Sequence, residues 1–235
     1  MKKIKSVKNK KVAVFDIDGT IFRSSLLIEV TEALISEGLF PASAKKVYAK
    51  SFTAWLNRQD SYDKYIYDVI KAFEKNIKQV RRSDYMRVGR KVIAFHQNRV
   101  YRFTRDLVKD LQKRGYFLLA ISHSPRELVE LFAQGLGFDK VYGRVLLSDG
   151  HGKFTGRVEH EELISDKAKI LKRAVAKEGL ALRGSVGVGD SEGDITLLRS
   201  VDRPIAFNPN SKLYQEARRR GWEIVVERKD VVYKI

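Results

Sequence analysis

Two pairs of carboxylates stand directly after short apolar segments of the chain. Asp16 and Asp18 follow VAVF in the sequence FDIDGT, and Asp190 and Asp194 follow SVGV in the sequence GDSEGD. Residues two apart on a strand share a face, so Asp16 and Asp18 can point into one pocket. Carboxylates gathered in one pocket repel each other unless a cation lies among them. All-oxygen ligands suit Mg²⁺, so we expect these four residues to form a magnesium site.

A hydroxyl group and an ammonium group are expected at the same place. Ser122 follows the apolar segment FLLAI, and Lys167 opens a helix predicted over residues 166–178. In open α/β sheets, ligands bind beyond the carboxyl ends of the strands, where these residues would converge. Lys169 is the alternative lysine, but Lys167 lies in the first helical turn and is therefore favoured. His123 is expected at the rim of the pocket without a catalytic role.

The glycine-rich segment GVGDSEG invites comparison with nucleotide-binding loops. Its third glycine comes one place later than the motif G-x-G-x-x-G requires, because Glu192 occupies that place. Asp190 and Glu192 would also repel a pyrophosphate. No G-x-x-x-x-G-K-[ST] motif occurs in the chain. The sequence therefore argues against dinucleotide-binding and P-loop folds.

The elements that must position these residues fall into two groups. After the first predicted strand, Lys11–Phe15, apolar residues recur every three or four positions through a block of about 75 residues. From residue 104 onward, predicted helices and strands alternate, which indicates an α/β fold with a parallel sheet covered on both faces. A hairpin is predicted around residues 149–152. The helices predicted in the block cover residues 24–37, 42–57, 60–79 and 83–98.

Composition excludes several other classes of protein. The 235 residues include no Cys and 4 His, which rules out disulfides, Cys-ligated metal clusters and Cys nucleophiles. No apolar stretch approaches the roughly 20 residues that span a bilayer. The basic N-terminus is followed by too short an apolar run for a secretory signal. We expect a protein of the cytoplasm without a membrane span.

The chain is strongly basic, with a net charge of +17. Six lysines fall within residues 2–11, and arginines cluster at 81–82 and at 218–220. Such charge could attract nucleic acid, a membrane surface or a phosphorylated substrate. No helix-turn-helix, zinc-finger or RNP-type motif accompanies it. A solvated basic surface is favoured, with no specific nucleic acid as partner.

Taken in order, FDIDGT, Ser122, Lys167 and GVGDSEGD resemble the four motifs of the haloacid dehalogenase (HAD) superfamily. The layout is similar to that of subfamily IB, the phosphoserine-phosphatase-like hydrolases. The resemblance implies a Rossmann-like core formed by residues 1–21 and 103–235. It also implies that residues 22–102 form an inserted, all-helical C1 cap.

The resemblance further implies a role for each motif residue. Asp16 would be the nucleophile that forms an aspartyl-phosphate, and Asp18 would be the general acid and base. Asp190 would bind Mg²⁺ directly, as would the backbone carbonyl of Asp18, and Asp194 would act indirectly on the metal. Phosphoryl oxygens of a small phosphorylated metabolite would be held by Ser122 and Lys167. The implied activity is Mg²⁺-dependent phosphomonoester hydrolysis.

Three positions depart from the phosphoserine phosphatase pattern. This chain has Gly19 where those enzymes usually carry Ser, Ser25 in place of a Glu that binds the substrate amine, and Gly193 in place of Asn. Glu29, one helical turn beyond Ser25, is expected to face solvent. L-Phosphoserine is therefore not expected to be the best substrate. A HAD-type phosphotransferase and a basic nucleic-acid- or membrane-binding protein on the same scaffold remain alternatives, and the sequence specifies no oligomeric state.

Overall fold

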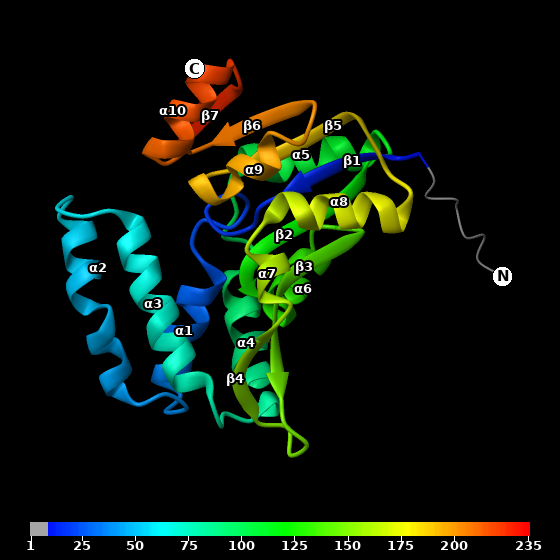
Figure 1. Cartoon of the computed structure of the whole chain (residues 1–235). Coiled ribbons are helices and arrows are strands. Elements are labelled where there is room, and N and C mark those ends of the chain that lie inside the picture. The colour runs from blue at the N-terminus through cyan, green and yellow to red at the C-terminus, as the bar shows by residue number, and fades with distance from the viewer. Residues whose placement is uncertain (1–8) are drawn as a thin grey trace.

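A computed structural model describes residues 9–235, and one sheet forms the centre of the fold (Figure 1). Its strands lie in the order β4-β3-β2-β1-β5-β6-β7-β8. Neighbouring strands from β3 to β7 run parallel, whereas β4 and β8 pair antiparallel at the two edges. The predicted α/β class is thus confirmed. The strands are β1 (Lys11–Phe15), β2 (Phe117–Pro125), β3 (Lys140–Ser148), β4 (Phe154–Glu159), β5 (Ala181–Gly189), β6 (Arg203–Phe207), β7 (Glu223–Arg228) and β8 (Val231–Lys234).

The central strand β1 is apolar along its length because both of its faces are covered. Val12 and Val14 pack in one hydrophobic cluster, with residues of a helix on that side of the sheet. Ala13 and Phe15 belong to a second cluster on the opposite face. All four side chains are fully buried. The alternation of side chains along β1 therefore determines the face of the sheet to which each side chain points. The same alternation applies to Asp16, which follows Phe15.

The helical block predicted after the first strand is present, with one difference. The helix predicted over 42–57 is divided at Tyr48 into a 3₁₀ segment and a short α-helix. Tyr48 is buried and its hydroxyl donates a 2.7 Å hydrogen bond to Glu32, which anchors the break. The helical elements of the block are α1 (Leu26–Ser36), η1 (Ala42–Val47), α2 (Ala49–Leu56), α3 (Tyr62–Ile77) and α4 (Arg82–His96).

The remaining helices cover the sheet or connect its strands. In Figure 1, α8 lies along one face of the sheet, while α1, α2 and α3 stand on the side toward which β1 points. The carboxyl end of β1 therefore faces the helical block. The elements outside that block are α5 (Arg102–Lys113), α6 (Arg126–Gln134), α7 (Glu161–Ile164), α8 (Lys167–Glu178), η2 (Glu192–Asp194), α9 (Ile195–Leu198) and α10 (Ser211–Arg220).

The hairpin of β3 and β4 is joined to the helical block by backbone hydrogen bonds. Gln79 donates to the carbonyl of Phe154 at 2.9 Å, and Phe154 donates to the carbonyl of Val80 at 3.0 Å. Arg82 donates to the carbonyl of Gly152 at 2.9 Å. The hairpin therefore holds the start of α4 in place, a connection that the sequence pattern does not reveal.

The sequence contains a lysine-rich segment near the N-terminus and predicts that the chain has no membrane span. Most of the lysine-rich segment 2–11 lies outside the described residues. Within residues 9–235, no helix combines the length and the apolar character needed to cross a bilayer.

Candidate active site

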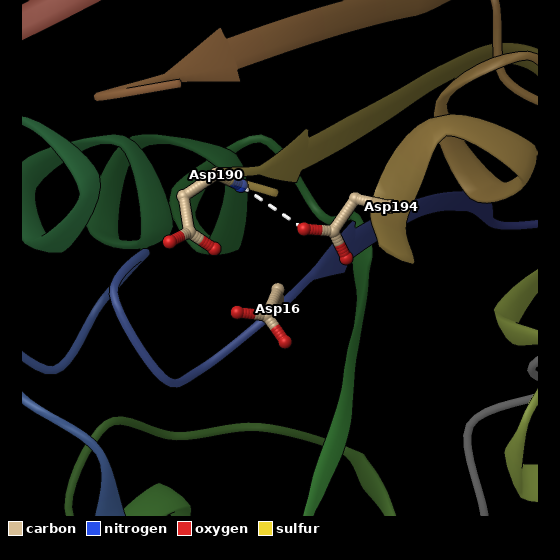
Figure 2. A group of neighbouring side chains, drawn as sticks. All are labelled: Asp16, Asp190 and Asp194. Carbon is tan, nitrogen blue, oxygen red and sulfur yellow. Dashed lines mark hydrogen bonds between the residues drawn. The ribbon is translucent and has the colours of Figure 1, made fainter. Parts of the chain in front are cut away.

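Three carboxylates converge at the carboxyl ends of β1 and β5. Asp16 follows β1, Asp190 follows β5, and Asp194 ends η2, four residues later. One carboxylate oxygen from each lies within 4.8 Å of the other two (Figure 2). Asp16 is 4% exposed and Asp194 is fully buried. Charges this close and this well shielded from water interact strongly.

Two glycines allow the backbone to bring these carboxylates together. Gly19 has a φ of +78°, and a Cβ at this position would lie 2.2 Å from Oδ2 of Asp190. A Cβ on Gly189 would lie 2.4 Å from Asp194. Any larger side chain at either position would displace a carboxylate. The glycine at 19, where phosphoserine phosphatases usually carry Ser, thus fits the close approach of Asp190.

Asp194 also shapes the loop that carries it. Its Oδ2 accepts hydrogen bonds from the backbone N–H groups of Asp190 at 3.0 Å and Ser191 at 3.1 Å. The first of these bonds is drawn in Figure 2. The bond from Ser191, together with the Ser191 side chain, forms a capping box at the start of η2. One oxygen of Asp194 therefore orders the loop, and the other faces the cluster.

Lys167 is the lysine that enters the site. It is the first residue of α8, whose N-cap, Asp166, accepts hydrogen bonds from the backbone of the first turn. The buried Nζ of Lys167 lies 2.5 Å from Oδ1 of Asp16 and 2.5 Å from Oδ1 of Asp194. Lys169 instead has 65% of its side chain exposed, and within residues 9–235 its one acidic partner is Asp166, at 3.9 Å. The structure thus places Lys167 in the site and Lys169 outside it.

The Asp18 side chain lies beside the cluster rather than within it. Its Oδ1 accepts a 2.6 Å hydrogen bond from the backbone N–H of Leu26, at the start of α1. Its Oδ2 accepts a 2.5 Å hydrogen bond from Oγ of Ser122. The group of carboxylates placed to share one cation therefore contains Asp16, Asp190 and Asp194, not the Asp18 side chain. Asp18 and Ser122, which the sequence assigns to different roles, are directly bonded.

Burial and mutual repulsion disfavour full ionisation of the cluster. Burial, with the charges of Asp194 and Asp18, raises the pKa of Asp16 to about 7, although Lys167 opposes this shift. Burial and the charges of Asp16 and Asp194 hold the pKa of Asp190 well above its usual range. A cation among the carboxylates would favour their ionised forms. The donor set, all oxygen and partly buried, fits Mg²⁺.

The comparison with known families decides the identity of this arrangement. A model of the haloacid dehalogenase-like hydrolases matches residues 13–199. The chain belongs to this family.

Several relatives of the chain are named as phosphatases. A phosphoserine phosphatase from Methanocaldococcus jannaschii is 27% identical to the chain, covering 95% of each sequence. A histidinol-phosphatase from Neisseria meningitidis serogroup C is 24% identical, covering 92% of this chain and 98% of the relative. A solved phospho-aspartyl intermediate analogue of phosphoserine phosphatase matches the fold with a TM-score of 0.64 at 22% identity, covering 95% and 96% of the two chains. The predicted membership of the phosphoserine-phosphatase-like HAD enzymes is confirmed, as is the prediction of a phosphatase.

One departure from the phosphoserine phosphatase pattern leaves space beside His123. A Cβ on Gly193 would lie 3.8 Å from Cε1 of His123, so a side chain could enter there without a clash. The Nε2 of His123 lies 3.0 Å from the carbonyl oxygen of Ile164. Desolvation of the ring and the nearby ammonium of Lys167 lower the pKa of His123 to about 4. The imidazole is therefore neutral at physiological pH.

The structure corrects the expected orientation of Glu29. Only 19% of this side chain is exposed, so the prediction that it faces solvent is wrong. Its carboxylate accepts hydrogen bonds from Ser24 at 2.6 Å and from Arg99 at 2.8 Å, and Nε2 of His96 lies 3.1 Å away. Arg99, at the far end of the helical block, pairs with Glu29 although 47% of its own side chain is exposed. The carboxylate is thus already paired with a cation.

Tyr62 is a residue of the helical block to which sequence reasoning assigns no role. It is the first residue of α3, and its ring packs against those of Trp55 and Tyr65. Burial raises the pKa of Tyr62, and the charges of Asp18 and Asp190 raise it further. The hydroxyl group therefore stays protonated, although 38% of the residue is exposed. Helical periodicity identifies the aromatic cluster, but not which end of α3 meets the site.

Proposed function

We propose that this HAD enzyme is a Mg²⁺-dependent phosphomonoesterase that works through an aspartyl-phosphate on Asp16. The observation that carries the proposal is the convergence of Asp16, Asp190 and Asp194, with Lys167 bonded to two of them. A bound Mg²⁺ would neutralise charge on these carboxylates and on a substrate phosphate. The residues we propose to hold the ion are Asp16, Asp190 and the backbone carbonyl of Asp18, with Asp194 acting indirectly.

In the first half of the reaction, a carboxylate oxygen of Asp16 attacks the phosphorus atom. A bond forms between this oxygen and phosphorus, and the bond to the leaving oxygen breaks. Asp18 donates its proton to the leaving oxygen, which departs as an alcohol. Ser122 holds Asp18 through its hydroxyl group and, with Lys167, binds the phosphoryl oxygens.

In the second half, water hydrolyses the aspartyl-phosphate. Asp18 is now ionised and takes a proton from the attacking water. The water oxygen bonds to phosphorus as the bond to Asp16 breaks, which releases inorganic phosphate and restores the carboxylate. Lys167 remains charged throughout, because burial lowers its pKa less than the charges of Asp16 and Asp194 raise it.

We further propose that residues 22–102 act as a cap that selects a small phosphorylated substrate. The two phosphatases described above are named for different substrates, phosphoserine and histidinol phosphate. In this chain Tyr62 and Glu29 belong to the helices that face the strand ends. The lack of cysteine fits the reducing environment of the cytoplasm, which we retain as the proposed location.

The direct test is a phosphatase screen over sugar phosphates, nucleotide monophosphates, phosphoamino acids and phospholipid head groups, each with Mg²⁺ and with EDTA. We expect phosphate release from at least one small phosphomonoester that stops in EDTA and returns with excess Mg²⁺. Undiminished activity in EDTA would contradict the metal requirement. Transfer of the phosphoryl group to an added alcohol without phosphate release would instead indicate a phosphotransferase.

A further inference from the structure

A groove lined by arginine side chains lies between the start of α4 and the turn of the β3–β4 hairpin. Its volume is about 540 Å³. In Figure 1 the hairpin extends away from the strand ends that carry the active site, and α4 begins beside it. The groove is therefore separate from the carboxylate cluster. The side chains that line it are Arg81, Arg82, Ser83, Met86, Arg90 and His151.

The two walls of the groove are fixed by the fold. Arg82 donates a 2.9 Å backbone hydrogen bond to Gly152, and Arg81 forms a β-bridge with Lys153. Beneath them, the buried rings of Tyr85 and Phe154 pack edge to face at 5.3 Å. A ligand that binds here would not have to order these walls, which lowers the cost of binding.

Much of the positive charge of the groove is unmatched. Arg82 pairs with Glu127 at 3.2 Å, but Arg81 and Arg90 form no ion pair with any residue from 9 to 235. Asp149 is the acid nearest in sequence to His151, and its Oδ1 accepts two backbone hydrogen bonds of the hairpin turn.

The other arginine cluster of the sequence behaves differently. Arg219 and Arg220 both bind the carboxylate of Glu216, which also binds Arg199. Charge along the sequence alone does not distinguish this cluster from residues 81–82. The structure does, because residues 81–82 line a groove and Arg81 is unpaired within residues 9–235, whereas Arg219 and Arg220 are neutralised by Glu216.

The spacing of the groove residues suits a compact anion. Arg82, Met86 and Arg90 recur every four residues and so share one face of α4. Arg81 and His151 border the same space from the preceding segment and the hairpin. Guanidinium groups bind phosphate oxygens in a bidentate manner and remain charged at every physiological pH. Three of them in one groove favour a ligand with several negative charges close together.

We propose that this groove is a second binding site, independent of the active site, for a compact polyanion of the oligophosphate type. Its volume falls within the range of small-ligand sites, roughly 300–1,000 Å³. No Phe, Tyr or Trp side chain lines it, so the stacking platform typical of single-stranded nucleic acid binding is missing from the groove. Recognition therefore rests on charge and on guanidinium geometry.

Calorimetric titration with inorganic tripolyphosphate in EDTA and about 0.15 M salt tests the proposal. EDTA keeps divalent cations from the active site, whose carboxylates then repel the anion. We expect Arg81→Ala/Arg90→Ala to weaken binding at least tenfold. The matched control Arg173→Ala/Arg183→Ala removes two exposed arginines that likewise lack ion pairs within the described chain, and should stay within twofold of wild type.

Equal weakening in both double variants would show diffuse charge attraction and overturn the proposal, as would wild-type affinity in the groove variant. Ser83→Asp is a second variant that places a carboxylate in the groove at a helix start, where Asp is well tolerated. It too should weaken binding tenfold. Phosphatase activity within twofold of wild type would show that both variants fold. Arginine-dependent binding of single-stranded RNA without binding of tripolyphosphate would also contradict the proposal.

Discussion

The ammonium group of Lys167 lies 2.5 Å from a carboxylate oxygen of Asp16, although 151 positions separate the two residues. The same Nζ lies 2.5 Å from Asp194. All three side chains are buried. The lysine thus ties the nucleophile proposed on β1 to the loop after β5, and it offsets only part of the negative charge gathered there. The remainder favours a divalent cation.

Loss of Lys167 should destabilise the fold as well as the chemistry. Lys167→Met leaves two buried carboxylates without their partner, and breaking a buried pair in this way costs about 3–5 kcal/mol. We expect a lower urea midpoint and at least roughly a 10²-fold loss of phosphatase activity, since a group that stabilises the phosphoryl transition state is removed. Lys169→Met, on the exposed side of the same helix, is the matched control. Coincident urea curves for the two variants would refute the assignment.

Asp190 should make the metal-free protein less stable as the pH rises. In the unfolded chain this carboxyl ionises near pH 3.8, whereas its folded pKa is raised well above that value. The protonated Asp190 therefore leaves the free energy of unfolding undiminished below about pH 4. That free energy falls as the pH rises toward the folded pKa of Asp190. Asp190→Asn lacks this loss, so in EDTA its Tm should exceed that of wild type by a margin that grows from pH 4 to pH 8.

Excess Mg²⁺ should reverse that order at pH 8, because it binds and stabilises only the wild type. Asp230→Asn, a change in an exposed turn, is the control for removal of one carboxylate. A Tm difference between Asp190→Asn and wild type that does not vary with pH would be inconsistent with a raised pKa at this position.

The hydroxyl group of Tyr62 should contribute to substrate binding. Its pKa is raised, so at physiological pH it is protonated and can donate a hydrogen bond to a substrate oxygen. Tyr62→Phe keeps the ring and removes the hydroxyl group. We expect kcat/KM on the best substrate to fall about tenfold, because one hydrogen bond to a charged group is lost. Tyr67→Phe, on the same helix but more exposed than Tyr62 (53% against 38%), serves as the control and should change kcat/KM less than twofold. Equal values for both variants would remove Tyr62 from the site.

L-Phosphoserine should not be the best substrate. Its ammonium group needs an anionic partner in a dry pocket. Ser25 is neutral, and Glu29 is held by Arg99 and Ser24. Measured kcat/KM values across the substrate screen decide the question. A tenfold lead for L-phosphoserine would disprove this expectation, and Glu29→Gln would then be the variant to compare with wild type.

The sequence predicts the core of this site because local rules determine it. The apolar runs of three strands end at Phe15, Ile121 and Val188, and parallel strands deliver the residues that follow these runs to one edge. The helical block is equally visible, since its periodicity extends over several consecutive helices. Strand β8 is harder to predict, because this edge strand, Val231–Lys234, is only four residues long and mostly exposed.

Other features depend on contacts between distant segments. Glu29 pairs with Arg99, which follows it by 70 residues, and the helical spacing of α1 contains no trace of that partner. The Asp18 carboxylate turns to Ser122 and to the start of α1 instead of joining the cluster, because backbone and side-chain donors are available there. Such pairings are decided by tertiary packing.

Phosphoenzyme trapping with p-nitrophenyl phosphate in Asp16→Asn and Asp18→Asn tests the central claim most directly. Asp16→Asn removes the attacking oxygen. Asp18→Asn keeps the attacking oxygen but removes proton transfer to the leaving group, which is typically worth ~10²–10⁴-fold in rate. A good leaving group such as p-nitrophenolate depends less on that proton transfer. Acid quenching followed by peptide mapping locates the phosphoryl group. We predict an aspartyl-phosphate on Asp16 in wild type and in Asp18→Asn, and none in Asp16→Asn. Equal phosphoenzyme yields in the two variants would contradict the mechanism.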